Sequence, residues 1–416
     1  MGSTEYLLGK FAGNVVFLST FIAGYMVTAM GMLLVRAEAP LEPLIFVKQY
    51  LLLLPPTIVF VSAVAILFEA VPWLSGRFGD VAYFFFWASS LGVVASKIEK
   101  AGAPTAAAYF DYSSFGYMIA NIKQVTGTSH ISIGASRFDA ANGVYVYSGL
   151  TLDGGWLLPR IVATLMPLAV LVIARLFFHR FDPARVRASV AKGKRNVLSL
   201  LNVPFKPIAA LLFAMARGGT SLLAAAKTDA LMTITSLPIA VAAIAGIAIA
   251  TFTASPTKVF PFAFAAFAVA IADISSREKR NGTIGLVFAS PLLRTRFVAW
   301  KFTSALLLGI AFCGVPAARF AALRPSTLPA LLVAIAFVAA AATALGIISA
   351  NPKTFIVAFL SFWYVVINDR GATPPLDFAG FYGTATPLVT LAYFASSVAL
   401  LAAAYAWHRR ELRVRW

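Results

Sequence analysis

The apolar stretch PALLVAIAFVAAAATALGIIS occupies residues 329–349 and contains no charged residue. A bilayer core is crossed by about 20 apolar residues in an α-helix, so this stretch predicts a transmembrane helix. The rest of the 416-residue chain has the same character, since 60% of its residues are hydrophobic and only 12% are charged. A soluble domain carries about 25% charged residues. The composition therefore excludes a soluble enzyme, a disordered chain and a nucleic-acid-binding protein.

Further runs of this kind predict an all-α polytopic membrane protein with about ten transmembrane helices. The predicted spans are 11–34, 51–69, 81–96, 156–178, 229–252, 260–275, 302–319, 329–349, 354–368 and 388–407. The third, sixth and ninth runs are short, so we expect these spans to be tilted, broken or re-entrant.

The distribution of basic residues predicts the orientation. With both termini in the cytoplasm, the cytoplasmic segments carry 23 Lys and Arg residues and the outside segments carry 10, while Arg160 lies within a span. Lys and Arg gather on the cytoplasmic side of spanning helices, so this orientation is favoured. The net charge of +18 is then mostly a signature of topology. Contact with anionic lipids also suits the basic stretch 175–195.

Two helical halves are predicted on either side of a basic linker. Residues 1–180 form the first half, with four spans and a long extracytoplasmic loop at 97–157. Residues 181–228 form a cytoplasmic linker with an interfacial helix, and residues 229–416 form the second half with six spans. The long loop includes a strand-like stretch at 143–147, and loops of this length fold on themselves or have a function. We expect either a small cap over the helix ends or a gate or docking surface.

The two halves look like diverged copies, as in many transporters. The second half has about seventy residues, with two spans, before Lys301, whereas the first half has only nine residues before the matching Lys10. This asymmetry predicts either ten spans as such or two further spans upstream of Met1, and we favour the latter. The matched pairs are Lys10-Phe11 with Lys301-Phe302, and Phe178-His179-Arg180 with Trp407-His408-Arg409.

The stretch SSREKRNGTIGLVFASP at residues 275–291 lies in a predicted cytoplasmic connection. Gly282 follows an asparagine, which predicts a tight turn. Thr283 is placed to accept a backbone N–H as the cap of an amphipathic helix that ends at Pro291. Lys301 is expected to anchor the next span at the lipid interface. These features predict a short helix flat on the inner membrane surface, able to pass a push from a soluble partner into the bilayer.

This stretch resembles the coupling region of type-2 ATP-binding cassette (ABC) exporter permeases, which have Glu, then Gly-Thr, a leucine-rich turn, Pro and a final Lys. The resemblance covers most of the chain by layout and about thirty residues by motif. The stretch Tyr6-Leu7-Leu8-Gly9-Lys10 is similar to the end of the same pattern, without its Glu and Gly-Thr. The matching residues of the second half are Glu278, Gly282-Thr283, Leu286, Pro291 and Lys301.

The resemblance implies a permease of the bacterial inner membrane, with both termini cytoplasmic, that exports an unidentified substrate. A separate ABC-type ATP-binding subunit would hydrolyse ATP and push on the coupling segment, residues 275–301. The chain has no Gly-x-x-x-x-Gly-Lys-Ser/Thr loop for ATP phosphates, so no cofactor is expected in it. The residues implied in coupling to the ATPase are Glu278, Lys279, Gly282, Thr283, Leu286, Pro291 and Lys301.

Asp273 and Arg160 lie in predicted spans, and ionisable residues there are candidate functional residues. Each also fits an interfacial residue that reaches the lipid headgroups. Two alternatives to the exporter are an ion-coupled secondary transporter and a non-transporting component that assembles a partner. The first is disfavoured because no acid lies at the middle of a span. The three histidines are far apart in the sequence, so we expect no metal site. The chain has neither a His-Glu-x-x-His nor a Gly-x-Ser-x-Gly motif, so we do not expect an enzyme.

Overall fold

The computed structural model describes residues 2–36, 40–71, 74, 77–101, 104–127, 149–178, 214, 221–236 and 240–415. Within these ranges every regular element is a helix, which confirms the all-α prediction. The chain separates into two compact units, unit 1 (Met1–Lys192) and unit 2 (Gly193–Trp416). Most of the predicted linker helix and the strand-like stretch 143–147 lie outside the described residues.

Among the described residues, seven helical segments are long and apolar enough to cross a membrane. A helix satisfies its own backbone hydrogen bonds in lipid, so the chain is a multi-pass α-helical membrane protein. In unit 1 these segments are α1 (Ser3–Arg36), α2 (Pro43–Ala70), the run α3 (Arg77–Ser89), η1 (Ser90–Val94) and α4 (Ala95–Ala101), and the run α6 (Gly154–Leu165), η4 (Met166–Leu168) and α7 (Ala169–Phe177). In unit 2 they are α17 (Phe297–Leu323), α18 (Leu328–Ser349) and α20 (Pro387–Arg415).

Three predicted spans take other forms. The run 229–252 falls on two helices, α11 (Leu222–Ser236) and α12 (Ala240–Thr253), which count as one span only if the pair crosses together. The run 260–275 falls on α13 (Pro256–Ile271), whose 16 residues are short for a bilayer. The run 354–368 falls on α19 (Pro352–Asp369). Length and composition therefore support about seven spans, and ten stays a prediction.

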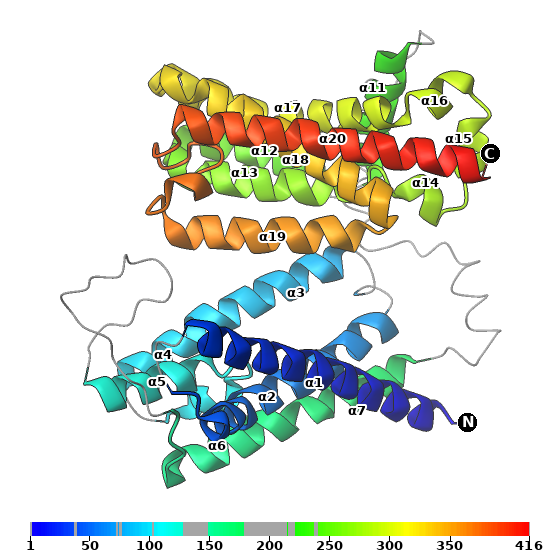
Figure 1. The fold of residues 1–416 in the computed structure, drawn as a ribbon. Helices are drawn as coiled ribbons and strands as arrows, with labels where there is room; N and C mark the ends of the chain where they lie inside the picture. Colours follow the sequence, from blue (N-terminus) through cyan, green and yellow to red (C-terminus); the bar gives the residue numbers. More distant parts are fainter. Residues whose placement is uncertain are drawn as a thin grey trace. The chain divides into compact units, whose positions relative to one another are not determined.

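Unit 1 has a core at each end of its helices. At one end α1, α2 and α7 meet, and Leu7, Ile66 and Ala174 are buried together. At the other end α5 (Phe115–Thr126) and η2 (Ala106–Phe110) pack on α4 and α6, around Tyr117 and Trp156 (Figure 1). The described part of the predicted 97–157 loop is thus helical and packed on the apolar helices.

Unit 2 is built around α18, which packs against α17, α19 and α20 (Figure 1). In the most apolar window of α18, 67% of the residues are buried, against 17% for α20, which marks α18 as the central helix. The buried stretch from Ala339 to Ala342 has only methyl side chains, so neighbouring helices approach closely.

Three short helices lie at one end of unit 2 and lead into α17. They are α14 (Arg277–Arg280), α15 (Ile284–Phe288) and α16 (Pro291–Thr295). The connections from α17 to α18 and from α19 to α20 lie at the opposite end, because α17 and α18 each run the length of the unit (Figure 1). Unit 2 thus has a coupling-segment end and an opposite end.

Candidate functional site

The coupling segment, residues 275–301, folds into three short helices before α17 and not into one. Gly282 has φ of +69°, a left-handed conformation that glycine adopts at no steric cost, so the predicted tight turn is confirmed. α15 ends at Phe288, and Pro291 then begins α16. Proline suits this first position because its missing N–H would have no helical partner there.

The predicted cap at Thr283 is wrong. Thr283 precedes α15, but its side chain makes no capping hydrogen bond to that helix. The Thr283 backbone N–H donates to the Glu278 carbonyl oxygen at 2.9 Å, and the Thr283 hydroxyl donates to the same oxygen at 3.4 Å. The hydroxyl is therefore engaged in closing the turn between α14 and α15.

Four charged side chains meet at the base of the segment and are called the ion cluster: Asp229, Arg277, Glu278 and Lys301. Lys301 Nζ, on α17, lies 3.0 Å from Asp229 Oδ2, on α11, and also donates to Glu278 Oε1, on α14. Arg277 Nη2 donates to Asp229 Oδ1 at 2.7 Å. The cluster therefore joins three helices through one aspartate and one lysine.

The ion cluster lies inside unit 2, since Lys301 is fully buried and Glu278 is 7% exposed. The predicted anchoring of Lys301 at the lipid interface is therefore wrong. Its ammonium lies 3.9 Å from the centre of the Trp300 ring, a favourable contact for a desolvated cation. Two carboxylates balance two cations, and removing one partner of such a buried pair costs about 3–5 kcal/mol. Glu278 and Lys301 thus hold the segment in place, while its surface is formed by other residues.

The end of α20 holds the segment from another side. Lys279 Nζ, on α14, donates to Glu411 Oε2 at 2.6 Å. The Nε2 atom of His408 lies 2.8 Å from the backbone oxygen of Arg294, on α16. The His408 ring also stacks on Phe297, with ring centres 5.4 Å apart. Both flanks of the segment are therefore tied to the last helix.

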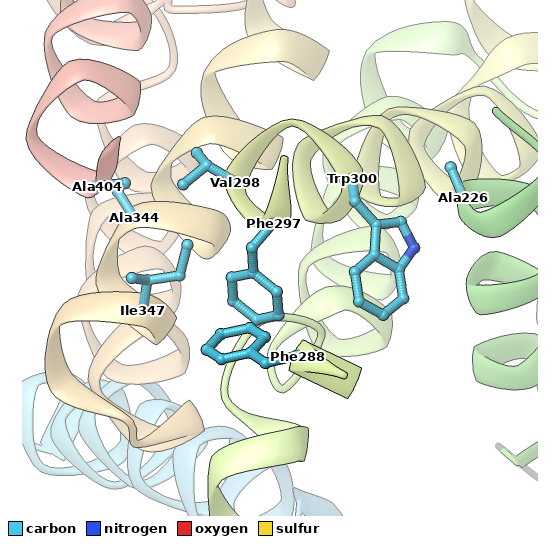
Figure 2. Packing of buried hydrophobic residues seen from close by; sticks show 8 residues of the cluster. All are labelled: Ala226, Phe288, Phe297, Val298, Trp300, Ala344, Ile347 and Ala404. Atoms are coloured by element: carbon cyan, nitrogen blue, oxygen red, sulfur yellow. The ribbon is translucent and has the colours of Figure 1, made fainter. Parts of the chain in front are cut away.

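An apolar core lies beneath the short helices (Figure 2). Phe288 of α15 meets Phe297 of α17 edge to face, with ring centres 5.5 Å apart. Such aromatic pairs contribute about 0.5–1.5 kcal/mol beyond the area they bury. The buried residues of this core are Ala226, Phe288, Phe297, Val298, Trp300, Ala344, Ile347 and Ala404.

The outer side of the segment is exposed. Four of its residues are exposed and together are called the exposed edge: Gly282, Thr283, Leu286 and Pro291. Leu286 keeps 80% of its surface. The residues implied in coupling therefore separate into these four and the largely buried Glu278, Lys279 and Lys301.

Asp273 lies beyond the end of α13, in the turn that leads to α14. Its backbone oxygen accepts the N–H groups of Ser276 and Arg277 at 3.1 and 2.9 Å. The residue is 8% exposed, so most of its side chain is covered by other residues of unit 2. Asp273 thus shapes the entry to the coupling segment, next to the ion cluster.

Arg160 belongs to a separate polar site in unit 1. Pro56, inside α2, lacks the N–H that would bond the backbone oxygen of Leu52. Arg160 Nη2 donates to that oxygen at 2.8 Å and to the Leu53 oxygen at 3.3 Å. The same nitrogen lies 2.6 Å from the Ser114 hydroxyl. Arg160 therefore satisfies the backbone that the proline leaves open.

The segment 104–127 is fixed on α2 through this arginine. The Asp111 carboxylate accepts the backbone N–H groups of Gly116 and Tyr117, and its Oδ2 lies 4.0 Å from Arg160 Nη1. The Tyr117 ring lies beneath the guanidinium at 5.1 Å. Arg160 is only 6% exposed and bonds both to α2 and to the segment 104–127.

Sequence reasoning missed three partners of the coupling segment: Asp229, His408 and Glu411. Asp229 is the only acid of α11, and Lys301 lies in the second turn of the largely apolar α17, where opposite charges are expected to pair. That signal could have suggested the Asp229–Lys301 contact. No comparable signal points to His408 and Glu411, since the polar end of a helix usually meets water. No family model, curated protein or solved structure matches the chain.

Proposed function

We propose that this chain is the membrane-spanning permease of an ATP-driven ABC exporter and works with a separate nucleotide-binding subunit. The observation that carries the proposal is the division of the coupling segment into an exposed edge and a buried base. The edge offers Leu286 and its neighbours to a partner outside the membrane. The base connects the edge to α11, α17 and α20 by ion pairs and packed rings.

A push on the exposed edge has a short path into the apolar helices. From α15 the Phe288 ring bears on Phe297, in the first turn of α17. From α14 the Glu278 carboxylate holds Lys301, one turn further along α17. Close-packed interiors transmit displacement because they have few voids. Since α20 is tied to the same segment, α17 and α20 would move together, as alternating access or lateral release requires.

Pseudo-repeated halves are part of the proposal, and contacts within each unit support them. Tyr6 and Phe178 stack in unit 1, and Phe297 and His408 stack in unit 2, both with ring centres 5.4 Å apart. Tyr6 precedes Phe297 by the same interval as Lys10 precedes Lys301. The stacking contacts pair Phe178 with His408, which is one residue out of step with the sequence match of Phe178-His179-Arg180 to Trp407-His408-Arg409.

We further propose that the chain crosses the bacterial inner membrane ten times and has both termini in the cytoplasm. The charge bias of 23 to 10 supports the orientation. The bent pair α11 and α12 and the short α13 and α19 would add three spans to the seven long ones.

Site-directed crosslinking in native membranes tests the coupling role. Leu286→Cys, in a Cys313→Ala background that has no other cysteine, carries a photoactivatable crosslinker on the exposed edge. We expect a crosslink to a protein with a Gly-x-x-x-x-Gly-Lys-Ser/Thr loop. Leu388→Cys is the matched control, because Leu388 is 75% exposed at the opposite end of unit 2. Equal yields of that crosslink from the two positions, or none from Leu286→Cys, would contradict the proposal.

The ion cluster favours a second candidate, an ion-coupled secondary transporter, because such carriers use buried carboxylates. Here, however, Asp229 and Glu278 are already neutralised by Lys301 and Arg277. Transport driven by a proton or sodium gradient in proteoliposomes without ATP, and lost in Asp229→Asn, would favour the carrier over the exporter.

A further inference from the structure

A cavity of about 530 Å³ opens at the end of unit 2 that lies opposite the coupling segment. Its walls are the start of α18, the start of α20 and the connection that includes Gly380, Gly383 and Ala385. Ala330, in the first turn of α18, is 5% exposed and forms part of the wall. Ligand sites commonly have volumes of about 300–1,000 Å³, so the space suits a small molecule or a single lipid chain.

The polarity of the lining changes along the helices. Ser326 and Thr327 lie in η6 (Pro325–Thr327), just before α18, and both line the cavity. Val333 and Phe394 line it further along α18 and α20, at about 1.5 Å of depth per residue. The lining hydroxyl groups, those of Ser326, Thr327 and Thr390, therefore lie nearer the helix ends than Val333 and Phe394, which is the order of an amphipathic ligand.

A positive charge lies at the same mouth. Arg324 Nη1 is 3.3 Å from the position that a Cβ on Gly383, a lining residue, would occupy. In the described part of the chain no carboxylate forms an ion pair with Arg324, whose guanidinium lies 6.0 Å from the centre of the Phe320 ring. The guanidinium is therefore free to bind an anion through charge-assisted hydrogen bonds.

The apolar side chains of α20 that line the cavity are also not covered by other parts of the described chain. Leu391 and Phe394 keep 61% and 52% of their surfaces, although both lie on a helix that is long and apolar enough to cross the membrane. Large apolar side chains at this depth contact lipid chains in the absence of a protein neighbour. A soluble anion would meet Arg324 but would leave this wall bare, whereas a lipid covers both.

We propose that the cavity binds one anionic phospholipid from the leaflet on that side of the membrane. Its phosphate lies beside Arg324 and Ser326, and one acyl chain lies along Val333 of α18 and along Leu391 and Phe394 of α20. The site is separate from the coupling segment, and its occupancy does not depend on an ATPase.

The test uses the full chain in nanodiscs and a tryptophan reporter. Phe394→Trp places an indole on the cavity wall, and Leu332→Trp places one on α18 at a position that is 57% exposed and outside the lining. Bromine atoms on acyl chains quench a neighbouring indole. Quenching by brominated phosphatidylglycerol is compared with quenching by brominated phosphatidylcholine, after subtraction of the parent chain's signal.

We expect about a fivefold preference for phosphatidylglycerol at Phe394→Trp, the effect of one arginine beside an anionic headgroup, and none at Leu332→Trp. Adding Arg324→Gln to Phe394→Trp should remove the preference. This exposed arginine has no ion-pair partner to lose within the described chain, so the fold should persist. Equal quenching by the two lipids, or a preference that survives Arg324→Gln, overturns the proposal. Loss of the preference on addition of inorganic phosphate assigns the site to a soluble anion and also overturns it.

Discussion

Lys301 and Asp229 form a buried ion pair, with Nζ 3.0 Å from Oδ2, although 72 residues separate them along the chain. Lys301 lies in the second turn of α17, and Asp229 lies in the middle of α11. The pair therefore sets the distance between two helices at the base of the coupling segment. Glu278 shares the same ammonium, so the segment and both helices depend on one cation.

Lys301→Met should lower the free energy of unfolding by about 3–5 kcal/mol, because it leaves Asp229 and Glu278 buried without their shared cation. Thermal unfolding in detergent measures the loss. Adding Glu278→Gln to Lys301→Met should recover part of it by removing one uncompensated charge. Lys258→Met, at an exposed lysine, should change stability by less than about 0.5 kcal/mol. A loss in Lys301→Met no larger than this control would show that the ion cluster does not hold the segment.

Gly282→Val should cost about 1–2 kcal/mol, because φ of +69° is unfavourable for a side chain with a Cβ. No atom outside the turn lies within 4 Å of a Cβ placed there, so the cost is confined to the backbone. Gly282→Asn should cost less, since asparagine is enriched in this conformation. Thermal unfolding of both variants checks this order.

A matched control for the turn is Gly246→Val, since Gly246 lies inside α12 with equally open space around it. Valine has a higher helix propensity than glycine, so this change should not destabilise the chain. If Gly282→Val behaves like Gly246→Val, or if Gly282→Asn costs as much as Gly282→Val, the left-handed turn is not maintained in solution.

Arg160→Met should destabilise unit 1 by about 1.5–3 kcal/mol, the usual contribution of a hydrogen bond from a charged group. The reason is that Leu52 loses the donor that replaces the missing N–H of Pro56. In a Pro56→Ala background the helix regains its own N–H, so the same change should cost about 1 kcal/mol less. A double-mutant cycle of thermal unfolding measures this coupling. Strict additivity of the two changes would refute the link between the arginine and the proline.

Asp377→Ala should destabilise unit 2 by about 2–3 kcal/mol. Asp377 follows η7 (Pro374–Leu376), and its carboxylate accepts the N–H of Thr384 at 3.0 Å and that of Tyr382 at 3.2 Å. These bonds shape the connection that buries Phe378 and Phe381 among the rings of α13. Asp377→Asn keeps one acceptor oxygen and should lose less. Limited proteolysis and thermal unfolding test this, and equal stability of all three proteins would exclude the role.

The helical, membrane-crossing character of the chain was predictable because it depends on local properties. An apolar run of sufficient length forms a helix in lipid whatever its neighbours are, and 329–349 and 388–407 were found in this way. The turn at Gly282 was predictable for a similar reason, since it needs a residue that accepts a positive φ. The cap at Thr283 failed because the side chain is turned toward the Glu278 carbonyl, to which its hydroxyl donates, and accepts no N–H from α15.

Local sequence thus accounts for the helical character of the long apolar runs and for the tight turn in the coupling segment. Which groups the charged residues contact was decided by how the helices pack together. The sequence favours Lys301 as a membrane anchor, yet it lies buried against Asp229. Arg160 lies in a segment of membrane-crossing length, as predicted, but its partner Leu52 comes from a distant part of the chain. The energy of a charge depends on its distance to other charges and on its removal from water, and both quantities exist only once the helices are assembled.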